Sequence, residues 1–174
     1  MRHLERGGEY LRVADPEWAN PLDGDFALER GGRWNPPGAF PVVYLCDSVA
    51  TARANVLRRL AGQPYRPEDL DPEAAPVLVA TRVASERYVD AISARGLSSL
   101  GLPETYPRGA SGRVVSHRAC QPIGEAAWHA GEPGIACRSA APRAPAGSEE
   151  LAWYQRSRRR LRRLRTHAFA DWFW

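Results

Sequence analysis

Lysine is absent from this sequence of 174 residues, and all 24 of its basic residues are arginines. A Schiff-base or general-base lysine is therefore excluded, and any phosphate group must be bound by arginine or by backbone N–H groups. Cysteine is also scarce, because Cys46, Cys120 and Cys137 are too few and too scattered for a disulfide scaffold. Isolated cysteines of this kind behave as small apolar residues in proteins of a reducing compartment, so we expect a cytoplasmic protein.

Long hydrophobic runs are missing too. No stretch approaches the roughly 18 consecutive apolar residues of a membrane span, and residues 1–10 contain no apolar signal segment. We therefore expect no membrane insertion and no secretion by the usual signal. His117 and Cys120, taken with His129 or Cys137, lack the second close pair of a zinc site, so no metal is expected.

The composition, with 44% hydrophobic and 25% charged residues, is that of one globular domain that can bury a core without disulfide or metal. Turn formers fill the first 40 residues, so regular structure there should be short. Short strands mixed with helices in no regular alternation favour the α+β class. The expected strands are 9–13, 41–46, 77–83, 134–138 and 150–154, the expected helices are 49–60 and 121–130, and 86–102 is a short helix or irregular.

The densest signal for chemistry is the turn Gly31-Gly32-Arg33, followed by Trp34. Glycines let a backbone approach a ligand and present its N–H groups, and a guanidinium suits a diphosphate or a carboxylate. The alternative is an ordinary turn whose tryptophan fills the core. By itself, the turn indicates an anion pocket only weakly.

The order of several motifs resembles the RES-domain family of bacterial toxin–antitoxin systems, which is named for an Arg, a Glu and a Ser. The resemblance spans most of residues 9–154 and implies one RES-like domain over 1–174, with a basic and aromatic C-terminal element at 155–174. The matching segments are Gly31-Gly32-Arg33-Trp34-Asn35, Val43-Tyr44-Leu45, Val49-Ala50-Thr51-Ala52, Gln121-Pro-Ile-Gly-Glu-Ala126 with Ala130-Gly131, and Gly134-Ile135-Ala-Cys-Arg-Ser139.

The resemblance implies a fold similar to ADP-ribosyltransferases of the diphtheria-toxin type, with a split, mostly antiparallel sheet and helices. It implies NAD as the substrate, cleaved at the nicotinamide–ribose bond by hydrolysis, phosphorolysis or ADP-ribosyl transfer, and an antitoxin with a helix-turn-helix domain as the partner. In this implied site Arg33 grips the phosphates or ribose, Tyr44 stacks on nicotinamide, Ser139 orients the ligand, and Gly31 and Gly32 belong to the binding turn.

The sequence departs from the family at Asn55, where the resemblance implies the glutamate. A carboxylate stabilises the positive charge that develops when an N-glycosidic bond breaks, and an amide does not. Either the domain is a catalytically impaired module that binds a nucleotide or a partner, or another carboxylate substitutes. The candidates are Asp47, which with Ser48 forms the expected N-cap pair of the helix, and Glu125, Glu149 and Glu150.

A basic run, Arg156–Arg165, is interrupted only by Ser157, Leu161 and Leu164. It could contact nucleic acid through phosphates. The leucines three apart, followed by Phe169 and Trp172, instead fit a terminal element packed on the domain with a solvated basic face. We favour this second interpretation and expect no nucleic-acid partner.

Overall fold

The computed structural model describes residues 1–157 and 159–174, so Arg158 of the predicted basic run lies outside the described residues. The strands are β1 (His3–Ala14), β2 (Val42–Cys46), β3 (Val77–Ala91), β4 (Gly134–Arg138), β5 (Glu149–Tyr154) and β6 (Arg162–His167). The helices are α1 (Asp25–Arg30), α2 (Val49–Leu60), the 3-10 turn η1 (Pro67–Asp69), α3 (Ala94–Ser99), α4 (His117–His129) and α5 (Phe169–Trp172).

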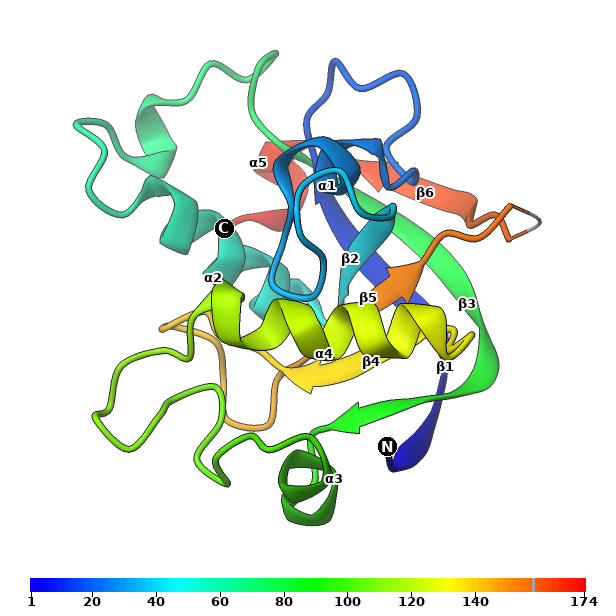
Figure 1. Ribbon diagram of the computed structural model, residues 1–174. Coiled ribbons are helices and arrows are strands. Elements are labelled where there is room, and N and C mark those ends of the chain that lie inside the picture. The colour runs from blue at the N-terminus through cyan, green and yellow to red at the C-terminus, as the bar shows by residue number, and fades with distance from the viewer. Residues whose placement is uncertain (158) are drawn as a thin grey trace.

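The six strands form a curled sheet in two parts (Figure 1). One part holds β1, β3 and β6, and the other holds β2, β5 and β4. They join where Leu11 of β1 pairs with Cys46 of β2, and where the end of β3 runs parallel to the start of β4. Among the described strands the other pairings are antiparallel, so the predicted α+β class with a split, mostly antiparallel sheet is confirmed.

Two predicted strands are longer than their sequence patterns indicate. Pairing runs from His3 opposite Val89 to Ala14 opposite Val77, so β1 begins six residues before the predicted 9–13 and β3 extends to Ala91. The prediction of a helix or irregular segment beginning at residue 86 is therefore wrong for 86–91. Each strand supplies the other's hydrogen-bond partners over a polar stretch, and this pairing outweighs weak local periodicity.

The predicted helix 49–60 is confirmed as α2, and of the expected cap pair Asp47-Ser48 it is Ser48 that caps the helix. The Ser48 hydroxyl accepts a hydrogen bond from the Thr51 amide. Helix α4 begins at His117, four residues before the predicted start, because Ser116 caps it in the same way. Pro122 consequently lies inside the helix and not in its first turn.

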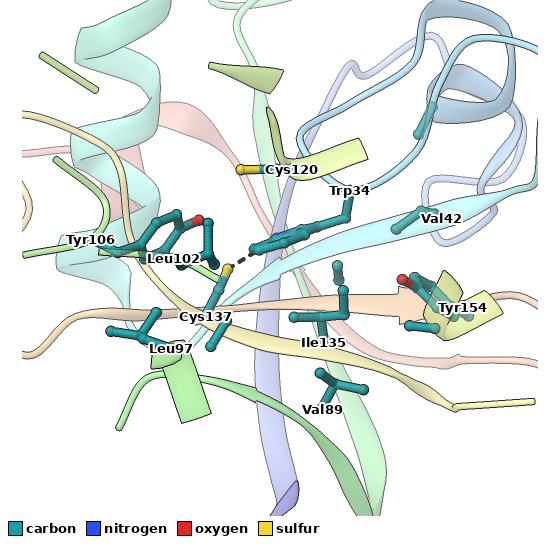
Figure 2. Close-up of a cluster of buried hydrophobic side chains, with 14 of the residues drawn as sticks. Trp34, Val42, Val89, Leu97, Leu102, Tyr106, Cys120, Ile135, Cys137 and Tyr154 are labelled. Carbon is teal, nitrogen blue, oxygen red and sulfur yellow. Dashed lines mark hydrogen bonds between the residues drawn. The ribbon is translucent and has the colours of Figure 1, made fainter. Parts of the chain in front are cut away.

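The apolar strand β2 is buried on both faces, which explains why its sequence reads as a continuous hydrophobic run. Val43 and Leu45 pack between the two parts of the sheet. Val42 packs on the other face, in a cluster that holds Trp34 of the α1–β2 turn, Ile135 of β4 and buried residues of α4 (Figure 2). A second cluster holds α2 and α5 against β1 and β3.

The C-terminal element differs from the predicted packing. The basic run becomes a loop and the edge strand β6, in which Leu164 is 42% exposed, so the expectation that both leucines pack on the domain is wrong for Leu164. Leu161 is partly buried against the sheet, and Phe169 and Trp172 are buried. Leu161 precedes β6, whereas Leu164 lies within this edge strand, whose residues are exposed from Arg162 to Thr166.

Candidate functional site

A cavity of about 210 Å³ opens where β1, β2 and α2 meet the turn after α1. Three arginines of this lining were not predicted from the sequence, namely Arg12, Arg58 and Arg59. The aromatic residues Trp18 and Phe26 were not predicted either. The cavity lining includes Arg12, Trp18, Phe26, Gly31, Gly32, Arg33, Tyr44, Asn55, Arg58, Arg59, His117 and Glu150.

The glycines of the turn shape the cavity wall without offering free N–H groups. The Gly31 amide donates to the Ala27 carbonyl and the Gly32 amide donates to the Asn35 carbonyl. A Cβ on Gly32 would lie 2.6 Å from Cζ of Tyr44, so only glycine fits against this ring. The expectation that these N–H groups bind an anion is therefore wrong, because both are already used within the turn.

The hydroxyl of Tyr44 holds the turn together. It accepts a hydrogen bond from the Trp34 amide at 2.8 Å and donates one to Oδ1 of Asn35 at 2.8 Å. The Asn35 amide in turn donates to the carbonyls of Ala27 and Phe40. Burial raises the pKa of the Tyr44 phenol, so the hydroxyl keeps its proton and its donor role. The Tyr44 ring remains part of the cavity wall.

Arg33 is a buried cation at the cavity, only 9% exposed. Its Nη1 donates to the Val115 carbonyl at 2.7 Å and lies 3.9 Å from Sγ of Cys120. Within residues 1–157 and 159–174, no carboxylate forms an ion pair with it. A buried guanidinium without a carboxylate partner favours an anionic ligand.

Two predicted site residues, Asn55 and Ser139, donate to one carboxylate oxygen of Glu150. Oε1 of Glu150 accepts a hydrogen bond from the Asn55 amide at 3.0 Å and one from the Ser139 hydroxyl at 2.6 Å. Asn55 and Glu150 line the cavity, whereas Ser139, 9% exposed, reaches it through Glu150. Residues 95 positions apart are thus brought into direct contact.

The other carboxylates considered from the sequence are placed elsewhere. Asp47 accepts hydrogen bonds from the Thr51 hydroxyl and the Glu149 amide, which ties α2 to β5. Glu149 accepts two hydrogen bonds from Arg6, at 2.7 and 2.8 Å. Glu125 belongs to α4 and is absent from the cavity lining. Of these four carboxylates, Glu150 alone lines the cavity.

The remaining wall is cationic. Arg12 is 5% exposed and stacks on Trp18, 5.1 Å from the ring centre, and burial lowers its pKa to about 10. Burial and the neighbouring Arg58 lower the pKa of Arg59, and burial followed by the charges of Arg33 and Arg58 lowers the pKa of His117. Arg12 and Arg59 keep their charge at neutral pH, and His117 is held toward its neutral form. Because Arg58 and Arg59 lie three and four residues after Asn55 in a predicted helix, their spacing could have indicated their place in the site.

The model of the RES domain family matches residues 9–173. The chain belongs to the RES domain family. The resemblance first indicated by the Gly31–Asn35 turn and the Gly134–Ser139 segment is therefore confirmed, and it extends beyond the expected 9–154 toward the C-terminus.

The chain is also similar to curated proteins and to a solved structure. The NAD(+) phosphorylases MbcT of Mycobacterium tuberculosis and Mycobacterium bovis are 33% identical to this RES domain over 109 residues, 62% of the chain and 54% of theirs. The chain thus matches about half the length of these curated relatives. The crystal structure of the M. tuberculosis MbcT–MbcA toxin–antitoxin complex contains a similar fold, with a TM-score of 0.79, 23% identity, and coverage of 98% of this chain and 91% of that one.

Over the described parts of the chain, no group of three or more His, Cys, Asp or Glu side chains is arranged to hold a metal ion. No helix in those same parts has the length and apolar character needed to cross a membrane.

Proposed function

We propose that this RES domain cleaves the bond between nicotinamide and ribose in NAD. The observation that carries the proposal is that one cavity is lined both by the buried cation Arg33 and by the carboxylate residue Glu150. NAD has the complementary chemistry, because its diphosphate is anionic and its ribose becomes cationic as the bond breaks. Membership of the RES family and the names of the MbcT relatives support this substrate.

Three of the residues implied by the resemblance have roles in this proposal. Arg33 binds the diphosphate, and the ring of Tyr44 forms the wall against which the planar nicotinamide stacks. Ser139 acts through Glu150, whose oxygen it contacts. The name of the MbcT relatives favours phosphate over water or a protein side chain as the acceptor of ADP-ribose.

The proposal is tested by incubating the purified protein with NAD, with and without inorganic phosphate, and following free nicotinamide and the ribose product. Arg33→Gln should weaken binding of ADP-ribose and lower nicotinamide release by tenfold or more, since about 1.5–3 kcal/mol is expected from a charged hydrogen bond. Arg30→Gln is the matched control, because the Arg30 side chain is 69% exposed. Binding of ADP-ribose by the unaltered protein without nicotinamide release would favour the alternative, a RES-like binding module.

We propose further that the partner is an antitoxin. The similar fold of M. tuberculosis was solved in a toxin–antitoxin complex. The helix-turn-helix domain implied by the sequence resemblance belongs to this same proposal. Co-purification of this chain with the product of an adjacent reading frame, and loss of nicotinamide release in the complex, would test it.

A further inference from the structure

Cleavage of NAD places a specific demand on the site. The bond between ribose C1′ and the pyridinium nitrogen breaks, and its electron pair leaves with neutral nicotinamide. An oxygen of phosphate or water then bonds to C1′, and water, if it is the acceptor, loses a proton. Positive charge develops on the ribose before the new bond forms, so a fixed carboxylate nearby lowers the barrier.

Helix α2 supplies no carboxylate at the expected position, because Asn55 stands there. The neighbouring strand does supply one. Glu150 lies in the middle of the second part of the sheet, paired with Cys46 of β2 on one side and with Cys137 of β4 on the other. Its backbone is therefore fixed by ladders on both edges, which gives the carboxylate the pre-organisation that electrostatic catalysis requires.

Hydrogen bonds fix the carboxylate itself. Oε1 of Glu150 accepts from both Asn55 and Ser139, and no described residue donates to Oε2. Oδ1 of Asn55 is a buried acceptor that has no partner among the described residues. Because Asn55 and Glu150 both line the cavity, the unpaired acceptor on each favours a ligand that brings hydroxyl donors and positive charge, as the ribose of NAD does.

The amide at position 55 also fits the presence of Glu150. Two carboxylates about 3 Å apart cannot both ionise readily, because like charges raise the pKa of one of them. An amide keeps the hydrogen bond to Oε1 and leaves the single charge on Glu150. Asn55 is therefore compatible with an active site whose charge comes from the strand.

We propose that Glu150 is the catalytic carboxylate of this RES domain, supplied by β5 in place of α2, with Asn55 and Ser139 as positioning residues. This inference rests on the proposed cleavage of NAD. It opposes the interpretation of Asn55 as the mark of an impaired enzyme.

The test compares nicotinamide release and ADP-ribose binding for the unaltered protein, Glu150→Gln and the control Glu125→Gln. Glu150→Gln should lower kcat by about 10²–10³ while ADP-ribose still binds, and Glu125→Gln should keep the unaltered rate. The double variant Asn55→Glu with Glu150→Gln returns the carboxylate to α2 and should recover at least tenfold of the loss. This second arm keeps the test decisive if Glu150→Gln alone folds poorly.

The positioning role of Ser139 has its own readout. Ser139→Ala removes a hydrogen bond to the ionised form of Glu150, so the acid limb of the pH–kcat profile should move to higher pH, and Ser139→Thr should reverse the move. A purely structural role of Ser139 would leave the profile in place.

The outcomes separate the two proposals. If the unaltered protein releases nicotinamide and Glu150→Gln does so at a similar rate, the role of Glu150 is overturned and the proposed function stands. If the unaltered protein releases none with either acceptor but Asn55→Glu does, the impaired-enzyme interpretation is correct and both proposals fail for the native chain.

Discussion

Single residues around the cavity combine support of the turn with a place in the cavity wall. Tyr44 is the clearest case, because its ring faces the cavity while its hydroxyl bonds two groups of the turn that carries Arg33. Arg33 is likewise anchored through the Val115 carbonyl. Such contacts hold a functional side chain in one geometry before the ligand arrives.

Tyr44→Phe should lower the free energy of unfolding by about 1–3 kcal/mol, because the Trp34 amide and Oδ1 of Asn35 both lose a buried partner. Urea unfolding followed by fluorescence measures this change. Tyr65→Phe serves as the control, since Tyr65 is 43% exposed and its loss should change stability by less than about 0.5 kcal/mol. Equal stability of both variants would contradict the support role of the hydroxyl.

Among the elements, α4 fixes the turn from the side opposite β2. Gln121 donates to the carbonyls of Gly32 and Asn35. Gly124 brings the helix backbone directly onto Trp34, whose indole donates to Sγ of Cys137 in β4 (Figure 2). Gln121, through its hydrogen bonds, and Gly124, through close packing, therefore hold α4 against the turn. The two residues lie about one helical turn apart in the predicted motif.

Gly124→Ala should destabilise the fold by about 2–3 kcal/mol, although alanine is the better helix former. The added Cβ would lie 2.6 Å from the carbonyl carbon of Trp34, and backbone cannot yield there. Thermal unfolding of this variant and of Gly109→Ala makes the comparison. A Cβ on Gly109 comes no nearer than 3.8 Å to the Arg113 oxygen, so that control should unfold as the unaltered protein does.

Across the whole molecule, some arginines hold segments of the chain together and others are solvated at the surface. The predicted basic run is only partly a solvated face, because Arg156 stacks 4.0 Å from the ring centre of Trp128 and Arg159 stacks 4.5 Å from that of Trp153. Arg159 also forms an ion pair with Glu86. These arginines join the C-terminal segment to the sheet and to α4, which reduces the charge free to meet nucleic acid.

Arg159→Ala should therefore lower the free energy of unfolding by about 2 kcal/mol, because a half-buried ion pair and a stacking contact are lost together. Arg160→Ala, at an exposed neighbouring site, should change it by less than about 0.5 kcal/mol. Chemical denaturation compares the two. An equal and negligible loss in both variants would show that the whole run is solvated.

Much of the local structure could be predicted from the sequence. The apolar run of β2, the cap at Ser48 and the helical pattern of α2 lie next to one another, and the turn around Arg33 is defined by its own glycines and tryptophan. Local patterns report the bonds that neighbouring residues make. They could not show how far β1 and β3 extend, because those hydrogen bonds join residues about 60 to 90 positions apart.

The sequence by itself determined the family, the residue types of the site and the absence of a carboxylate at Asn55. Only the tertiary structure decided which carboxylate stands beside that amide. Asp47, Glu125, Glu149 and Glu150 are equivalent in a linear chain, and alternation along β5 turns Glu149 toward Arg6 and Glu150 toward Asn55. Pairing of β5 with β2 and β4 is a contact between distant segments, so no local pattern could have made that choice.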